Sequence, residues 1–184
     1  MPLRNTAENY GSLAKLLHWS IVILIIVQYF IAEAADELPD GLEKLQVLSR
    51  HKSVGMLLLM LAVVRILWKL ANKGQPVPVG TGALKKAAAA GHGLLYLLLL
   101  LQPISGWAMS SAANYPVAFF GWFQFPALVG THPGLHEILE DVHEVLFYVL
   151  VAVAVLHILA ALYHHFAMKD DVLKRMLPLG KRTG

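Results

Sequence analysis

The sequence contains no cysteine. Disulfide bonds, cysteine-ligated iron–sulfur clusters and the attachment of any cofactor through a cysteine sulfur are therefore excluded. Charge is scarce as well, because only 15% of the 184 residues are Asp, Glu, Lys or Arg, whereas 57% are hydrophobic. This composition is too apolar for an ordinary soluble domain and is typical of an integral membrane protein.

Four segments are apolar over the length of about 20 residues that a helix needs to cross a bilayer. Lipid offers the backbone no hydrogen bonds, so spans without a two-residue alternation are expected to be helices. We predict an all-α membrane protein, a bundle of four transmembrane helices that forms one domain over 1–184. The predicted spans are approximately 12–33, 51–70, 87–110 and 135–166, and a tail over 167–184 follows them.

Basic residues are unevenly distributed between the loops. The N-terminal tail, the second loop and the C-terminal tail, with the helix ends beside them, hold 12 of the 15 Lys and Arg residues, whereas the other two loops are acidic. The positive-inside rule then places both termini in the cytoplasm. The membrane explains the basic residues, so no nucleic-acid partner is predicted. A second interpretation treats Ala32-Glu33-Ala34 as a signal-peptide cleavage site, which would leave three spans.

The loops differ in character. An acidic outer loop over 33–49 is expected to hold a short amphipathic helix at 42–48, and the Pro- and Gly-rich segment 71–82 is expected to be an extended linker. The loop over 112–130 has six aromatic residues between positions 115 and 125. It is either an aromatic belt at the membrane interface or a lid over a cofactor. The tail predicts a short surface helix that ends at Pro178.

Two of the nine histidines lie on the last predicted span. His143 and His157 are 14 residues apart, so a helix places them about 40° apart on one face and about 21 Å apart along its axis. A polar ring in hydrocarbon is costly without a functional partner, so these residues predict a functional site. Their spacing favours two metal cofactors stacked across the membrane.

Other spans supply a partner histidine at each depth. His51 lies near the outer end of its span, as does His143, while His18 and His92 lie toward the inner side, as does His157. A six-coordinate haem iron needs two axial ligands on opposite faces of the ring, and facing helices of a bundle supply them. We predict two non-covalently held haems, one between His143 and His51 and one between His157 and either His18 or His92.

Small and charged residues accompany these histidines. Gly55 lies one turn from His51, and Gly106 lies on nearly the same face as His92, so both leave room for a flat ring. Arg65 lies at the inner depth, where its guanidinium either pairs with a haem propionate or extends to the cytoplasmic surface. The histidines expected at loops, at the surface or at the end of the last span are His132, His136, His164 and His165.

Two other metal sites fit parts of this pattern. Glu140-x-x-His143 resembles half of a carboxylate-bridged di-iron site, but the sequence has no second motif of this kind. A haem-free, histidine-lined metal transporter is the other alternative. Its acidic residues would lie deep in the spans, whereas here they cluster at an outer helix end.

Together these residues resemble the bacterial cytochrome b561 family, and the resemblance covers nearly the whole chain. It rests on the order and spacing of short motifs rather than on any one of them. The matching pieces are His18-Trp19, His51-x-x-x-Gly55, Arg65, Gly91-His92, Pro103, Gly106, His143, His157, His164-His165-Phe166, Lys169-Asp170 and Arg175-Met176-Leu177-Pro178.

The resemblance implies a particular ligand set and activity. His18 with His157 and His51 with His143 would ligate two b haems. His92 would contact a haem propionate or the surroundings of the ligands rather than the iron. The protein would be a multi-pass protein of the bacterial inner (plasma) membrane. The implied activity is superoxide:ubiquinone oxidoreductase, with superoxide oxidised at the periplasmic side and the quinone reduced. No catalytic residue is assigned, because one-electron chemistry belongs to the cofactor.

Substrate surfaces follow from the same resemblance. The candidate quinone residues near the inner haem are His164, His165, Lys15 and Trp19. Arg50 and Lys52, beside His51, would attract superoxide at the outer mouth, although the outer loops are acidic overall. An alternative is a cytochrome b subunit that exchanges electrons between quinone and a periplasmic redox protein docked on the aromatic loop.

Overall fold

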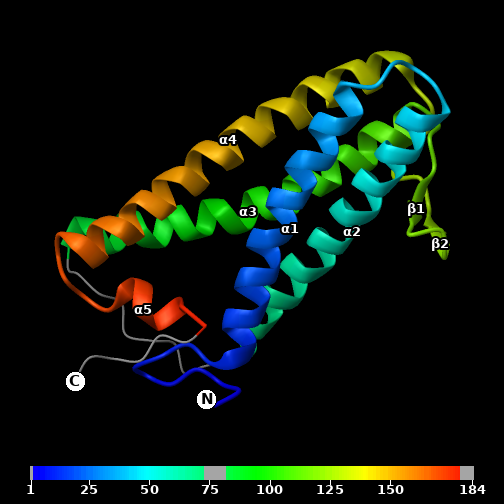
Figure 1. Ribbon diagram of the computed structural model, residues 1–184. Helices are drawn as coiled ribbons and strands as arrows, with labels where there is room; N and C mark the ends of the chain where they lie inside the picture. The colour runs from blue at the N-terminus through cyan, green and yellow to red at the C-terminus, as the bar shows by residue number, and fades with distance from the viewer. Residues whose placement is uncertain (1, 73–81, 179–184) are drawn as a thin grey trace.

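The computed structural model describes residues 2–72 and 82–178, and four long helices dominate them (Figure 1). All four are long and apolar enough to cross a membrane, so the predicted multi-pass helical membrane protein is confirmed. Most of the predicted linker over 71–82 lies outside the described residues. The long helices are α1 (Ser12–Asp36), α2 (Leu42–Ala71), α3 (Gly82–Ala112) and α4 (Pro133–Phe166).

The first outer connection is shorter than predicted. Helix α1 continues to Asp36, so the candidate cleavage site at 32–34 lies within it, and α2 begins at Leu42. The segment 42–48 is therefore the first part of α2 rather than a separate amphipathic helix. Its apolar positions recur at helical spacing and no Gly or Pro separates it from the span that follows, so nothing stops the helix there.

Local sequence features explain the start of α4 and the interior of α3. His132 caps α4, because its Nδ1 accepts the backbone N–H of Leu135 at 3.0 Å, and Pro133 occupies the first turn. Pro103 lies inside α3 and deprives that helix of one backbone donor. His136, which was expected in a loop or at the surface, lies in the first turn of α4, with its Nδ1 3.2 Å from the carbonyl of Met109 on α3.

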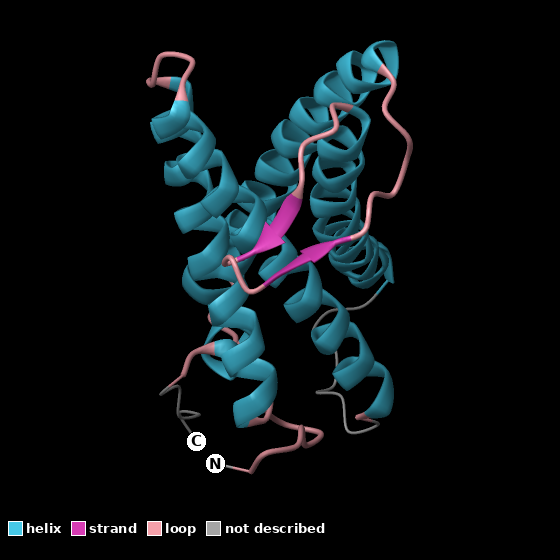
Figure 2. Ribbon diagram, turned by 90° about the vertical axis from the view of Figure 1, so that its right-hand side faces the viewer, coloured by secondary structure: helices cyan, strands magenta, loops and turns pink. Residues whose placement is uncertain are grey.

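The aromatic loop contains a β-hairpin that the sequence did not predict. Strands β1 (Val117–Phe119) and β2 (Phe123–Phe125) pair antiparallel, with Ala118 opposite Gln124, and Figure 2 shows them lying across the helices. Ser53 of α2 attaches the hairpin: its hydroxyl lies 2.9 Å from the carbonyl of Ala118 and accepts the N–H of Phe120 at 3.0 Å. Trp122, at the turn, is 80% exposed.

The helices form two hairpins set at an angle to one another (Figures 1 and 2). Helix α1 packs along α2 and α3 packs along α4, while α2 and α3 join the two pairs. Within the described residues, neither α1 nor α2 packs closely along the backbone of α4. Many large apolar side chains are exposed on the outside of the helices, as lipid-facing side chains are.

The tail folds back against the start of the chain. The short helix α5 (Val172–Met176) follows α4, and the carbonyls of Met176 and Leu177 accept hydrogen bonds from Trp19 Nε1 and Lys15 Nζ, both at 2.9 Å. Helix α5 is half-buried rather than free on the surface. The beginning and the end of the described chain therefore lie at the same end of the bundle.

Candidate functional site

Helix α4 presents two histidines to the other hairpin at two levels. The ring of His143 lies 6.4 Å from the ring of His51 on α2, and the ring of His157 lies 6.5 Å from that of His18 on α1, between ring centres. Both pairs have an interplanar angle of 75°. The two levels, 14 residues apart on α4, are separated by about 21 Å. We call the pair near the described termini, His157 and His18, the inner level, and the pair away from them, His143 and His51, the outer level. Sequence positions more than 90 residues apart are thus brought together twice in the same geometry.

His157 has a second histidine neighbour. The ring of His92, on α3, lies 5.1 Å from the ring of His157, nearer than that of His18. His92 Nδ1 lies 2.8 Å from the carbonyl of Ala88 one turn earlier in the same helix. The inner level therefore brings three imidazoles together, with both His18 and His92 close to His157.

The outer level is lined by α3. Ser105 Oγ lies 2.9 Å from His143 Nδ1, and Gln102 Nε2 lies 3.2 Å from His143 Nε2. A Cβ added at Gly106 would lie 2.9 Å from His143 Cε1, so only glycine leaves the ring this place. Sequence reasoning paired Gly106 with the face of His92 and did not select Ser105 or Gln102. Polar residues at i and i+3 in an otherwise apolar span were the signal for them.

Across from His143, His51 keeps a buried Nδ1 that has no hydrogen-bond partner. Gln28 of α1 donates its amide to the carbonyl of His51 at 2.9 Å, and its own Oε1 is buried without a partner. A Cβ at Gly55 would lie 3.4 Å from that amide nitrogen, an ordinary contact. Gln28 was not identified from the sequence, because nothing local to it marks the neighbouring helix.

Arg65 faces the inner level rather than the surface. Its Nη1 lies 2.7 Å from His18 Nδ1, and its guanidinium carbon lies 5.6 Å from the centre of the Tyr96 ring. Lys69 Nζ lies over the same ring at 4.6 Å. The side chain of Arg65 is thus turned toward a histidine, at the depth that helical spacing predicted.

The four residues considered for quinone contacts lie around the tail. Lys15 and Trp19 donate hydrogen bonds to backbone carbonyls at the C-terminal end of α5. His164 Nδ1 contacts the carboxylate of Asp170, and His165 Nδ1 is buried without a partner. Burial opposes ionisation of Asp170, but the hydrogen bonds from His164 and from the Val172 N–H outweigh it and lower the pKa of that carboxyl.

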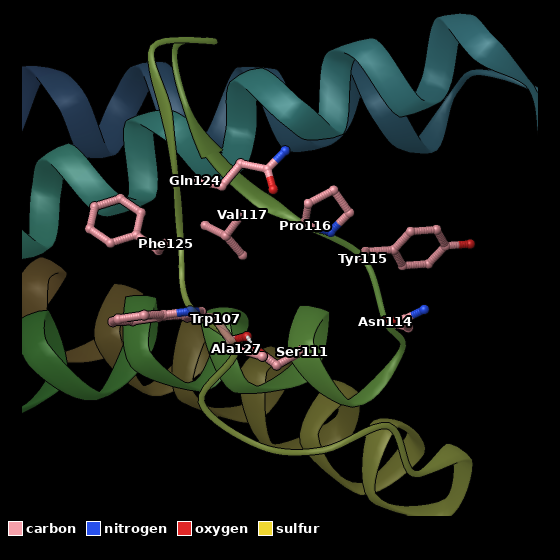
Figure 3. Close-up of a pocket in the computed structure, with 9 residues that line it drawn as sticks. All are labelled: Trp107, Ser111, Asn114, Tyr115, Pro116, Val117, Gln124, Phe125 and Ala127. Atoms are coloured by element: carbon pink, nitrogen blue, oxygen red, sulfur yellow. Dashed lines mark hydrogen bonds between the residues drawn. The ribbon is translucent and has the colours of Figure 1, made fainter.

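Two hollows lie beside the β-hairpin in the described part of the chain, at the end of the bundle away from the termini. Figure 3 shows the first, between the end of α3 and the hairpin, with Trp107, Val117 and Phe125 among its walls. The second lies between α2 and the turn of the hairpin. It is lined by Gln46, Ser49, Arg50, Ser53, Phe120 and Gly121.

The two basic residues beside His51 differ in their surroundings. Arg50 is exposed in the second hollow. Lys52 lies with its Nζ 5.2 Å from the centre of the Tyr115 ring and 3.5 Å from the carbonyl of Pro116. Of these two residues, Arg50 is therefore the one that presents its charge openly.

Comparison with known proteins identifies the family. The family model described as prokaryotic cytochrome b561 matches residues 9–179. The chain belongs to the prokaryotic cytochrome b561 family. It is 37% identical to cytochrome b561 homolog 2 of Escherichia coli over 96% of this chain and 95% of that protein. It is 30% identical to the probable superoxide oxidase CybB of Yersinia pestis (93% and 97%) and to cytochrome b562 of Cereibacter sphaeroides (92% and 95%).

Membership of the cytochrome b561 family makes the chain a haem-b protein that transfers electrons in a membrane. The residues present fit such a group. Imidazole is a usual axial ligand of haem iron, the buried His51 Nδ1 is a polar atom without a partner, and Gly106 leaves room for the imidazole of His143 opposite it. The predicted family and the predicted electron-transfer role are therefore confirmed.

Proposed function

We propose that this cytochrome b561 binds two b haems, one between His51 and His143 and one between His18 and His157. The matched ring separations of 6.4 and 6.5 Å carry the proposal. Two metal–nitrogen bonds of about 2 Å each, plus the distance from each nitrogen to its ring centre, give roughly 6 Å. The distance of 5.1 Å between the ring centres of His92 and His157 is shorter than this. We therefore propose that His92 does not ligate the iron and instead contacts the haem or its surroundings.

Arg65 would need a different partner with haem bound. A histidine that binds metal through Nε2 keeps its proton on Nδ1, and a guanidinium has only donors, so the contact between Arg65 and His18 Nδ1 would have to open if His18 held the iron. We propose that a haem propionate carboxylate then serves as the counter-ion of the Arg65 guanidinium within the membrane. The haem supplies reversible one-electron chemistry, and the protein residues hold it, orient it and exclude water.

The proposed reaction is oxidation of superoxide coupled to reduction of ubiquinone. Two superoxide anions each give up one electron and leave as dioxygen, and one ubiquinone takes up two electrons and two protons to become ubiquinol. The probable superoxide oxidase among the relatives supports this substrate. The exposed Arg50 beside His51 offers a positive charge where the anion would arrive. No side chain is proposed as a general base or nucleophile.

The quinone is proposed to bind at the inner level, beside the tail. His164 and His165 offer ring nitrogens there, while Lys15 and Trp19 hold the tail in place through the backbone bonds described above. Proton uptake then occurs on the side of the termini. We propose that this side is the cytoplasm and that the membrane is the bacterial inner membrane, in keeping with the basic residues near both ends.

The visible spectrum and iron content of the purified protein test the haem assignment. Two b-type haems per chain are expected, and His143→Ala and His157→Ala are each expected to lose one of them. His132→Ala, at the cap of α4, is the matched control and should retain both. A colourless protein with bound zinc would instead support a histidine-lined transporter and would overturn the proposal.

Stopped-flow reduction by superoxide tests the substrate. Rapid haem reduction, followed by reoxidation when ubiquinone is added, is the expected result. Arg50→Gln should slow the first phase, and raising the ionic strength should slow it in the wild type, because both weaken attraction of the anion. Slow reduction by superoxide, with rapid reduction by a periplasmic redox protein, would favour a partner that docks on the exposed aromatic hairpin around Trp122.

A further inference from the structure

His143 has polar side chains of α3 at both of its ring nitrogens. Ser105 Oγ lies at 2.9 Å from Nδ1 and Gln102 Nε2 at 3.2 Å from Nε2. The same Ser105 hydroxyl also lies 2.8 Å from the main-chain carbonyl of Gln102. Ser105 is 7% exposed, so water does not replace these partners freely. The hydroxyl thus has two close neighbours and only one hydrogen to give.

The hydrogens in this cluster are assigned by what each atom is able to donate. A carbonyl oxygen only accepts, so Ser105 donates its hydrogen to the carbonyl of Gln102 and accepts from His143 Nδ1. The Gln102 amide nitrogen only donates, so it faces a lone pair on His143 Nε2. Both neighbours select the same neutral imidazole, with the proton on Nδ1 and the lone pair on Nε2.

We propose that Ser105 is a positioning residue that holds His143 in the metal-binding tautomer and orientation. Histidines that bind metal commonly donate their other ring N–H to an acceptor, which fixes the ring and makes its ligating nitrogen more basic. Ser105 is that acceptor for His143 Nδ1–H. The hydrogen bond from the Gln102 amide to His143 Nε2 would be replaced by the bond from that nitrogen to iron. This inference rests on the proposed function, because it requires an iron at Nε2.

The inner level provides an internal reference. At His18 the atom next to Nδ1 is Arg65 Nη1, at 2.7 Å, which is a donor and not an acceptor. Ser105 lies on the outer half of α3, where its hydroxyl contacts His143 of the outer pair. Removing its hydroxyl is therefore expected to change the outer haem and to leave the inner haem unchanged.

Ser105→Ala tests the proposal. The affinity of the outer site for haem should fall by about 10- to 100-fold, the usual effect of removing such a partner. The midpoint potential of the outer haem should rise, because a less basic imidazole favours ferric iron less. A tenfold change in the ferric-to-ferrous affinity ratio corresponds to about 59 mV for one electron. Ser105→Thr, which keeps a hydroxyl, should restore both values.

Ser111→Ala is the matched control on the same helix. Ser111 is also buried and also donates to a carbonyl of α3, that of Trp107 at 2.8 Å, but it accepts from the Leu128 N–H instead of a histidine. This variant should leave both potentials unchanged. An unchanged inner haem in Ser105→Ala shows that the variant has folded.

The possible outcomes distinguish a failure of the role given to Ser105 from a failure of the proposed function. If the wild type holds two haems, and Ser105→Ala leaves the affinity and the potential of the outer one as they were, the role given to Ser105 is wrong while the proposed function stands. Equal losses of outer-site haem affinity in Ser105→Ala and Ser111→Ala would show that Ser105 acts only through packing. That result would also overturn the role given to Ser105. A wild type without two haems would refute the proposed function itself.

Discussion

At the scale of single residues, the contact between α3 and His143 depends on the absence of a side chain. A Cβ at Gly106 would lie 2.9 Å from Cε1 and 3.2 Å from Nδ1 of that ring, well inside ordinary van der Waals contact. The neighbour is a ring held by Ser105 and Gln102, so it cannot yield as the end of a flexible chain would.

Gly106→Ala should therefore displace His143. We expect loss of the outer haem absorption and a destabilisation of about 1–3 kcal/mol, the usual cost of overpacking. Visible spectroscopy and thermal unfolding in detergent measure the two effects. Gly93→Ala is the control on the same helix, because a Cβ there meets no atom within 4 Å and alanine favours a helix over glycine. Full retention of both haems in Gly106→Ala would contradict the expectation.

The sequence was informative about some residues and silent about others. His143 and His157 were found because a spacing of 14 residues brings two side chains onto one helical face whatever the rest of the fold does. Ser105 and Gln28 were not found, because their roles depend on how α3 and α1 are rotated against neighbouring helices. The same dependence explains why Gly106 was assigned to the face of His92 when it lies against His143.

At the scale of elements, the tail is held by specific contacts at both ends. His164 contacts Asp170 where α4 ends, and Trp19 and Lys15 bind the backbone where α5 ends. The sequence predicted a short helix here but not its attachment, because Lys15 and Leu177 are 162 positions apart. The hairpin over 117–125 was missed for a similar reason, since Ser53 on α2 holds it. The aromatic residues of this segment also do not follow the two-residue alternation that predicts a strand.

The pH dependence of the tail follows from Asp170. Its pKa in the folded state lies below the ordinary value of 3.8, so its ionisation stabilises the docked tail above that value. This contribution is lost as the pH falls through the folded pKa. We expect amide hydrogen exchange in 170–177 to accelerate below about pH 4.

Asp170→Asn should remove this stabilisation at neutral pH and should make exchange in the tail faster and less dependent on pH. Asp171→Asn is the control, because Asp171 pairs with Lys174 at 3.4 Å three residues along the same short helix, and such surface pairs contribute little. An identical exchange profile in wild type and Asp170→Asn would show that the contact with His164 does not hold the tail.

At the scale of the whole molecule, the described termini lie at one end of the bundle and the β-hairpin turn lies beside the outer half of α2. The absence of cysteine makes the proposed orientation simple to test. A cysteine at the exposed Asn114 should react with a membrane-impermeant maleimide added to intact spheroplasts. A cysteine at the exposed Ala7 should react only after the membrane is permeabilised. The reverse pattern would refute cytoplasmic termini.

The weak backbone packing between α4 and the first hairpin bears on how the protein is assembled. Helices α1 and α2 form one closely packed unit and α3 and α4 form another, joined by α2 against α3. Each unit is a helical hairpin that satisfies its own backbone in lipid, so we expect both to enter the bilayer before they meet. If the haems bind between the two hairpins as proposed, haem insertion would be a late step in biogenesis that joins two preformed halves, and a shortage of haem would leave an inserted chain vulnerable to membrane proteases.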